Sequence, residues 1–124
     1  MKSITWLGNT HETVKNYSSN VRQEIGYNLD KVQRGLEPID WKQMTAIGHG
    51  VKEIRIHQNN EYRILYVAKF HETIYVLNCF VKKSEQTLKS DLDLAKKRYI
   101  DLVAKRRSIK KWKNTLLKKV FLMI

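Results

Sequence analysis

The sequence holds a single cysteine and a single proline, and it has no long apolar run. One cysteine cannot form an intramolecular disulfide, which excludes a disulfide-stapled secreted fold. Because Cys79 alternates with Leu77 and Val81 in a strand-like segment, we expect a buried free thiol. A transmembrane helix needs about 18 apolar residues, and neither such a run nor a basic-then-apolar leader pattern is present. We therefore expect a soluble cytoplasmic protein.

Acidic residues are scarce in the second half of the chain. Residues 1–61 carry 8 Lys or Arg against 7 Asp or Glu, whereas residues 62–124 carry 16 against 5. The formal net charge of +12 is thus concentrated in the second half. This asymmetry predicts an anionic partner, which can be nucleic acid, an acidic protein or an anionic membrane surface. Charge alone does not choose among the three.

Metal-binding and phosphate-cradling motifs are also missing. His11, His49 and His71 are scattered without metal-ligand spacing, so we expect no metal and no cofactor. The glycines form no phosphate loop. Gly48 and Gly50 instead flank His49 in a spacing that suits a tight entry into a strand.

The length of 124 residues suits one compact domain. Apolar residues that recur three or four apart predict helices, and alternating segments predict strands joined by short hairpin connections. Between them, the segment IDWKQMTAIGHGV is interpreted as a packed loop with one helical turn at most. The predicted elements are a strand at 3–7, a helical hairpin at 10–35, an antiparallel meander of strands at 51–57, 61–70 and 73–82, and a final helix whose apolar stripe runs from Leu88 to Val103, with Ser90 and Asp93 as its capping pair.

Alternation along the meander predicts a polar face on the sheet. In its first strand, Arg55 and His57 alternate with Ile54 and Ile56, so the two polar side chains share one surface. If Arg63 in the next strand shares that open face, its apolar neighbours fill the core beneath the helices. A rigid sheet that presents basic side chains in this way suits the binding of a polyanion such as RNA.

Together these pieces resemble the RelE/ParE toxin superfamily, in particular its HigB-type, phage-derived branch. The resemblance is carried by GHGVKEIRI (48–56), EYRILYVAKF (61–70), FVKKSEQT (80–87) and DLDLAKKRY (91–99). It covers residues 1–107 and implies an α+β fold, in which an N-terminal strand and helical hairpin pack on a small antiparallel sheet with a C-terminal helix. The implied activity is a metal-independent endoribonuclease that cuts messenger RNA in the ribosomal A site. A cognate helix-turn-helix antitoxin is the expected partner, besides messenger RNA and the ribosome.

The catalytic residues that the resemblance implies are basic. By position, Arg55, Arg63 and Lys83 match basic residues of the family, and Lys82 is the neighbour that we add. Arginine grips phosphate oxygens with a planar fork and stays charged, which suits stabilisation of the transition state. A lysine acidified by neighbouring positive charge can donate a proton, which suits Lys82 or Lys83, and His57 can act as a base.

Further RNA contacts are predicted for four lysines: Lys69, Lys89, Lys96 and Lys97. Purely structural alternatives remain open for the catalytic set. Arg55 can pair with Glu53 or Glu61 on a solvated sheet face, and the two lysines at 82 and 83 can simply mark a solvated strand end. Tyr99 lies on the packing stripe of the final helix and is interpreted as a core residue.

Two rival functions stay open. One is a non-enzymatic poison that resembles the ParE branch and inhibits DNA gyrase by binding. The other is a basic nucleic-acid-binding module without toxicity, whose affinity would fall steeply with salt.

The end of the chain differs from the rest. Residues 105–124 hold eight Lys or Arg and no acid, with Trp112, Leu116 and Val120 at positions i, i+4 and i+8. This pattern fits a flexible arm on ribosomal RNA, an amphipathic helix on a membrane surface, or an accidental extension of the reading frame. We therefore predict a toxin domain over residues 1–107 and an extension over 108–124 without a role in catalysis.

Overall fold

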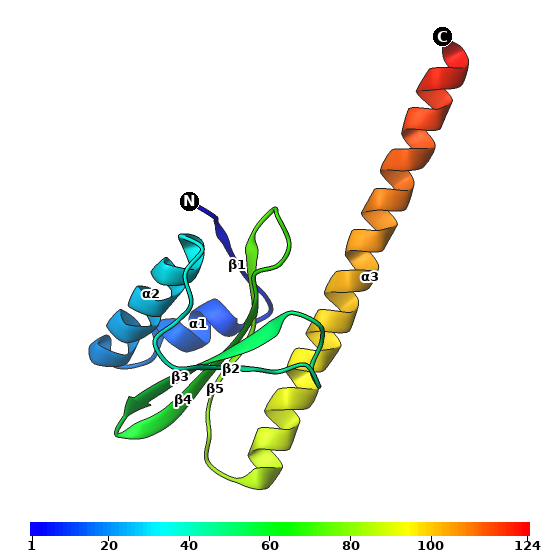
Figure 1. The fold of residues 1–124 in the computed structure, drawn as a ribbon. Helices are drawn as coiled ribbons and strands as arrows, with labels where there is room; N and C mark the ends of the chain where they lie inside the picture. The colour runs from blue at the N-terminus through cyan, green and yellow to red at the C-terminus, as the bar shows by residue number, and fades with distance from the viewer.

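The computed structural model describes residues 1–124, apart from the side chain of Thr87. The elements in chain order are β1 (Ile4–Trp6), α1 (Thr10–Lys15), α2 (Ser19–Gln33), β2 (Trp41–Gln43), β3 (Val51–Gln58), β4 (Asn60–Val67), β5 (Ile74–Val81) and α3 (Glu85–Met123). The strands form one sheet in the order β1-β5-β4-β3-β2 (Figure 1). The predicted α+β class and the meander β3-β4-β5 are confirmed. The sheet is mixed rather than wholly antiparallel, because β1 pairs in parallel with β5.

Helices cover both faces of this sheet (Figure 1). On one face, α1 and α2 bury their apolar stripes against the strands, as the helical periodicity predicted. Ile54, Ile56 and Ile64 are fully buried there, which confirms the predicted inward face of β3 and β4. Cys79 belongs to the same core as a free thiol, and burial raises its pKa to about 12. The prediction of a buried free thiol is therefore confirmed.

On the other face, α3 covers only part of the sheet. Its residues Ala95, Tyr99 and Leu102 pack against Leu65 and Val67 of β4, in a second buried cluster. Tyr99 is thus a core residue, as predicted. This packing occupies the end of β4 near Val67, and the same face carries polar side chains beside the start of β4.

Glycine allows α3 to come close to the chain that enters β3. A Cβ added to Gly48 would overlap the ring of Tyr99, and Gly50 has a positive φ of 83° that L side chains rarely adopt. The Tyr99 hydroxyl donates a hydrogen bond to the carbonyl of His49 at 2.8 Å. The predicted tight entry into the strand is confirmed, and it also serves to seat the helix.

Two local predictions are wrong. Residues 41–43, predicted inside a packed loop, form strand β2, which pairs antiparallel with β3. The final helix begins at Glu85 rather than near Ser90, because the amide of Leu88 already donates an i→i−4 hydrogen bond to the Ser84 carbonyl at 2.9 Å. Ser90 and Asp93 therefore lie inside α3 and do not cap it.

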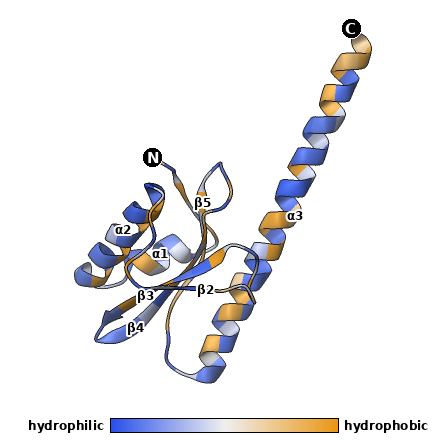
Figure 2. Cartoon of the chain, in the orientation of Figure 1, coloured by the Kyte–Doolittle hydropathy of each residue, from blue (hydrophilic) through white to orange (hydrophobic). Residues whose placement is uncertain are grey.

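Beyond the sheet, α3 continues as a single helix far past the body of the protein (Figure 1). Every residue from 107 to 124 is exposed. Figure 2 shows that hydrophilic and hydrophobic residues alternate along this projecting part. The predicted division at residue 107 falls within the helix and stays a prediction. Among the described residues, no helix combines the length and apolar character that a membrane crossing requires.

Candidate nucleic-acid site

The sheet face beside the start of β4 carries two adjacent cross-strand pairs of charged residues. Arg55 of β3 lies directly opposite Arg63 of β4, and His57 lies directly opposite Glu61. Residues two apart on a strand share a face, so all four side chains emerge on the same surface. The register is set by the tight turn at Asn59, whose φ of 62° is one that asparagine tolerates.

Two like charges directly opposite each other repel, and Glu53 compensates them. Its carboxylate is buried, with Oε1 lying 3.1 Å from Nε of Arg55 and 3.7 Å from Nε of Arg63. The structural alternative in which Arg55 pairs with Glu53 is therefore present in the molecule. The same contact holds the two guanidinium groups side by side, so the pairing also builds the site.

The two arginines differ in how much of the guanidinium group is available. The Arg63 side chain is only 8% exposed; its Nη1 donates to the Tyr62 carbonyl at 3.0 Å and its Nη2 to Glu61 at 3.2 Å. The Arg55 side chain is 34% exposed and bonded only through Nε. Among the described residues, its two terminal nitrogens have no partner. Arg55 is therefore the arginine that can present a free fork to a phosphate.

His57 lies between two carboxylates. Its Nε2 is 2.6 Å from Oδ2 of Asp40, and its Nδ1 is 2.7 Å from Oε1 of Glu61. The hydrogen bond to Asp40, followed by that to Glu61, raises the pKa of His57 above its ordinary value of 6.5. The hydrogen bond from His57 in turn lowers the pKa of Glu61. This arrangement favours the imidazolium form, which can donate a proton, and the role of base stays a prediction.

Lys82 and Lys83 follow the end of β5 and are both exposed. The amide of Lys82 donates to the Glu61 carbonyl at 2.8 Å, so pairing with β4 extends one residue past β5. Because Phe80 is opposite Arg63, alternation places Lys82 on the face of the arginines. Neither lysine forms an ion pair with a described residue, and Lys82 is the better placed of the two.

The four lysines predicted to contact RNA fall into two groups. Lys89, Lys96 and Lys97 are exposed along α3. Lys69 lies past the end of β4, away from the arginines, where its Nζ is 3.0 Å from His49 Nδ1 and donates to the Tyr99 hydroxyl at 3.1 Å. The structure therefore does not bring Lys69 together with the catalytic set, and it gives this lysine a packing role beside α3.

Asp40 is the member of the site that the sequence analysis missed. It directly precedes β2, and its carbonyl accepts a hydrogen bond from the Arg55 amide at 2.9 Å. Only the pairing of β2 with β3 brings it to His57, and a three-residue strand gives no periodic signal. The two carboxylates contact opposite nitrogens of the ring, so they do not converge on one point. No group of His, Cys, Asp and Glu in the described part of the chain is arranged to hold a metal ion.

These features define a small α+β protein with a preorganised cationic site on a sheet face. A comparison with known protein families matches residues 12–100 to the family described as phage-derived protein Gp49-like (DUF891). The chain therefore belongs to the phage-derived Gp49-like family. No curated protein and no solved structure matches it. The matched residues include the whole site from Asp40 to Lys83 and end before the projecting part of α3.

Proposed function

We propose that this protein is the toxin of a type II toxin–antitoxin system, a HigB-type member of the RelE-like toxins. In this proposal it is a metal-independent endoribonuclease that cuts ribosome-bound messenger RNA and so inhibits translation. Membership of the Gp49-like family, which is associated with RelE-like toxins, supports it. The observation that carries the proposal is the placement of His57, held between Asp40 and Glu61 on the same face as Arg55.

The chemistry of metal-free RNA cleavage fits these side chains. The ribose 2′-hydroxyl gives its proton to water as its oxygen bonds to phosphorus, negative charge grows on the phosphoryl oxygens, and the bond to the 5′-oxygen breaks as that oxygen takes up a proton, which leaves a 2′,3′-cyclic phosphate. Arg55 and Lys82 would hold the phosphoryl oxygens, since both present free N–H donors on one face. His57, whose pKa is raised by its two carboxylates, would exchange one of these hydrogen bonds for one to the leaving 5′-oxygen and donate that proton. Arg63 would act as a positioning residue, because its guanidinium is buried and engaged.

A cognate helix-turn-helix antitoxin is the proposed neutralising partner. The net charge of +12 and the open cationic face support a partner that presents acidic residues over the site. Covering Arg55 and His57 would block access of RNA to both groups. The ribosome and its messenger RNA are the proposed targets of the free toxin.

The test is 5′-end mapping of transcripts from translating ribosomes after induction of the protein. Arg55→Ala is the informative variant, because Arg55 is half-exposed, whereas Arg63 is buried and its removal endangers the fold. Arg22→Ala is the matched control, since Arg22 is an exposed arginine on α2, across the sheet from the site. We expect cuts within translated codons for the parent and for Arg22→Ala, and their loss for Arg55→Ala.

The other outcomes separate the rival functions. Growth arrest with intact transcripts and induced DNA damage would reject the nuclease and favour a gyrase poison. Absence of arrest, with salt-sensitive binding to RNA, would leave a nucleic-acid-binding module. Cuts that persist in Arg55→Ala would retain the nuclease and remove Arg55 from its site.

A further inference from the structure

The end of α3 from Arg107 to Ile124, here called the C-terminal arm, leaves the body of the protein (Figure 1). The last attachment is Arg106, whose Nε donates to Glu72 Oε2 at 2.7 Å and whose guanidinium lies 3.8 Å from the centroid of the Phe70 ring. Every arm residue is exposed. The helix therefore carries both faces of the arm into solvent.

One face of the arm is an apolar stripe. Its members recur three or four residues apart, which places them on one side of a helix. The stripe consists of Ile109, Trp112, Leu116, Val120 and Met123. Trp112 is 64% exposed and Met123 is 85% exposed, so these large side chains have no partner within the body. The last five residues, VFLMI, are all apolar, so the arm ends in a turn that is apolar on every side.

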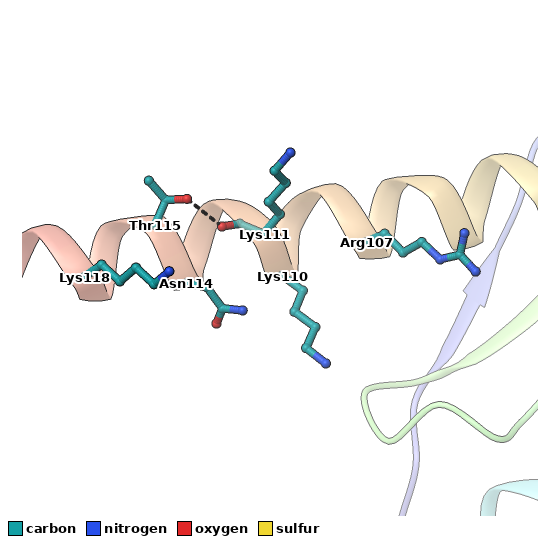
Figure 3. Close-up of a pocket in the computed structure, with 6 residues that line it drawn as sticks. All are labelled: Arg107, Lys110, Lys111, Asn114, Thr115 and Lys118. Atoms are coloured by element: carbon teal, nitrogen blue, oxygen red, sulfur yellow. Dashed lines mark hydrogen bonds between the residues drawn. The ribbon is translucent and has the colours of Figure 1, made fainter.

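The opposite face of the arm is cationic over its first turns and carries Leu117 and Phe121 beside Lys118 further along. Figure 3 shows the side chains of this face, with Lys110 and Lys111 projecting from opposite edges of the helix. The cations are Arg107, Lys110, Lys111 and Lys118, with Asn114 and Thr115 between them. At about 100° per residue, Lys111 and Lys118 lie roughly opposite the apolar stripe. No Asp or Glu follows Asp101 in the sequence, so nothing in the arm neutralises these charges.

We propose that the C-terminal arm binds the surface of an anionic phospholipid membrane. The apolar stripe, with Trp112 at the interface, would enter the boundary between headgroups and acyl chains, and the cationic face would lie toward anionic headgroups. A helix with these two faces is the type that lies in the plane of a membrane surface. This inference goes beyond the proposed nuclease function and rests on none of its residues.

The charge and the apolar stripe of the arm together favour an anionic lipid surface over a second copy of the arm and over RNA. A second copy of the arm would bring two acid-free cationic helices together, which their mutual repulsion opposes. RNA would satisfy the cationic face and leave the stripe in water. Within the arm, Arg107 and Lys111 are four residues apart and repel each other, and an anionic lipid surface relieves that repulsion while burying the stripe.

The arm and the sheet site are separated along the molecule. In Figure 1, the free end of α3 projects from the opposite end of the body to the turn between β3 and β4. Membrane binding through the arm therefore leaves Arg55 and His57 uncovered. Loss of vesicle binding and loss of RNA cleavage can accordingly be measured as independent properties.

The test is flotation of the full chain with vesicles of phosphatidylcholine alone and vesicles in which about one lipid in three is phosphatidylglycerol. We expect binding to the anionic vesicles only. The double variant Leu116→Gln, Val120→Gln keeps the charge and should weaken that binding at least about tenfold, because two large apolar side chains no longer enter the interface. Lys111→Gln, Lys118→Gln keeps the stripe and should also weaken it about tenfold or more.

The matched control is Asn114→Gln, Thr115→Ser, which alters the same turns on the polar side and should bind as the parent does. Because the arm makes no contact with the body, all variants should unfold at the parental temperature. Equal vesicle binding by the stripe variant and the parent would overturn the proposal. So would an absence of vesicle binding together with arm-dependent binding of RNA, or arm-dependent dimerisation in sedimentation.

Discussion

The sheet site and the C-terminal arm are both cationic, but they hold their charges in opposite ways. In the site, Arg55 contacts Glu53, Arg63 contacts Glu61, and His57 lies between two carboxylates. In the arm, among the described residues, no cation has a carboxylate partner. Paired cations lose freedom and gain a fixed geometry, which suits one oriented phosphate, whereas unpaired cations attract an anionic surface without specifying a geometry.

Removing the carboxylate at the centre of the site should have the largest effect on stability. In Glu53→Gln, Arg55 and the buried Arg63 would face each other without the negative charge between them. We expect the free energy of unfolding to fall by about 3 kcal/mol, as when a buried ion pair loses one partner. Urea denaturation followed by circular dichroism measures the change. Asp101→Asn, at an exposed position on α3, is the control and should change it by less than about 0.5 kcal/mol.

The contacts of Arg106, which attach α3 to the body just before the arm, should contribute less to the free energy of unfolding than Glu53 does. Arg106→Ala removes the two hydrogen bonds to Glu72 and the contact with Phe70, and should cost about 1 kcal/mol at neutral pH. Arg107→Ala, one residue later and exposed, is the control and should cost nothing measurable. An equal loss in both variants would show that Arg106 does not anchor the helix.

The ion pair between Arg106 and Glu72 also predicts how stability depends on pH. The hydrogen bonds that Arg106 donates lower the pKa of Glu72 from 4.5 to about 2. A carboxylate with a lowered pKa stabilises the fold above its unfolded pKa and loses that contribution as the pH falls through the folded value. The stability difference between the parent and Arg106→Ala should therefore be constant above pH 4.5 and fall, as the pH approaches about 2, to the part that the Phe70 contact contributes. A difference that is as large in acid as at neutral pH would contradict the ion pair.

Removing the carboxylate on one side of His57 should shift the pKa of its imidazole rather than unfold the protein. His57 has a raised pKa, mainly through Asp40, so the stabilising contribution is present below its unfolded pKa and is lost as the pH rises through its folded pKa. In Asp40→Asn, the pKa of His57 should move back toward 6.5. NMR titration of the imidazole protons measures it. Asp30→Asn, which alters an ion pair on α2, should leave the titration unchanged.

The smallest effect is expected in the arm. Lys111→Ala and Lys118→Ala should each change the free energy of unfolding by less than about 0.5 kcal/mol, because neither side chain contacts the body. Thermal unfolding of the two variants beside the parent checks this. A loss above about 1 kcal/mol would mean that the arm supports the fold, and the contrast between the two cationic regions would fail.

Strand alternation was sufficient to predict the face of the site but not its internal contacts. Arg55 and His57 were placed on one surface because β3 has a regular period of two. Arg63, however, is only 7% exposed, and residue type alone does not predict a buried arginine. The contact between Asp40 and His57 also escaped prediction, since it depends on β2, which is too short to show alternation.

For α3 as well, the sequence predicts one feature correctly and another wrongly. Its stripe from Leu88 to Val103 was predicted from spacing, and Ala95 and Tyr99 are buried as expected. Its start was misplaced because Ser90 and Asp93 imitate a cap, whereas the backbone ladder begins at Ser84. Sequence spacing identifies which residues can share a helix face, but hydrogen bonding of the backbone decides where the helix begins.

The parallel pairing of β1 with β5 bears on the order in which the chain is made. Ile4 pairs with Ile74, so β1, the first strand to be synthesised, cannot pair until β5, the last strand, has been made. Such a distant closure slows folding, because the entropy of a long loop is lost before the contact forms. Arg63 also pairs with Phe80, so a nascent chain that has not reached Val81 lacks the complete β5, one of the two neighbours of β4. Because Lys82 directly follows β5, the site is complete only once β5 has left the ribosome and has paired with β4.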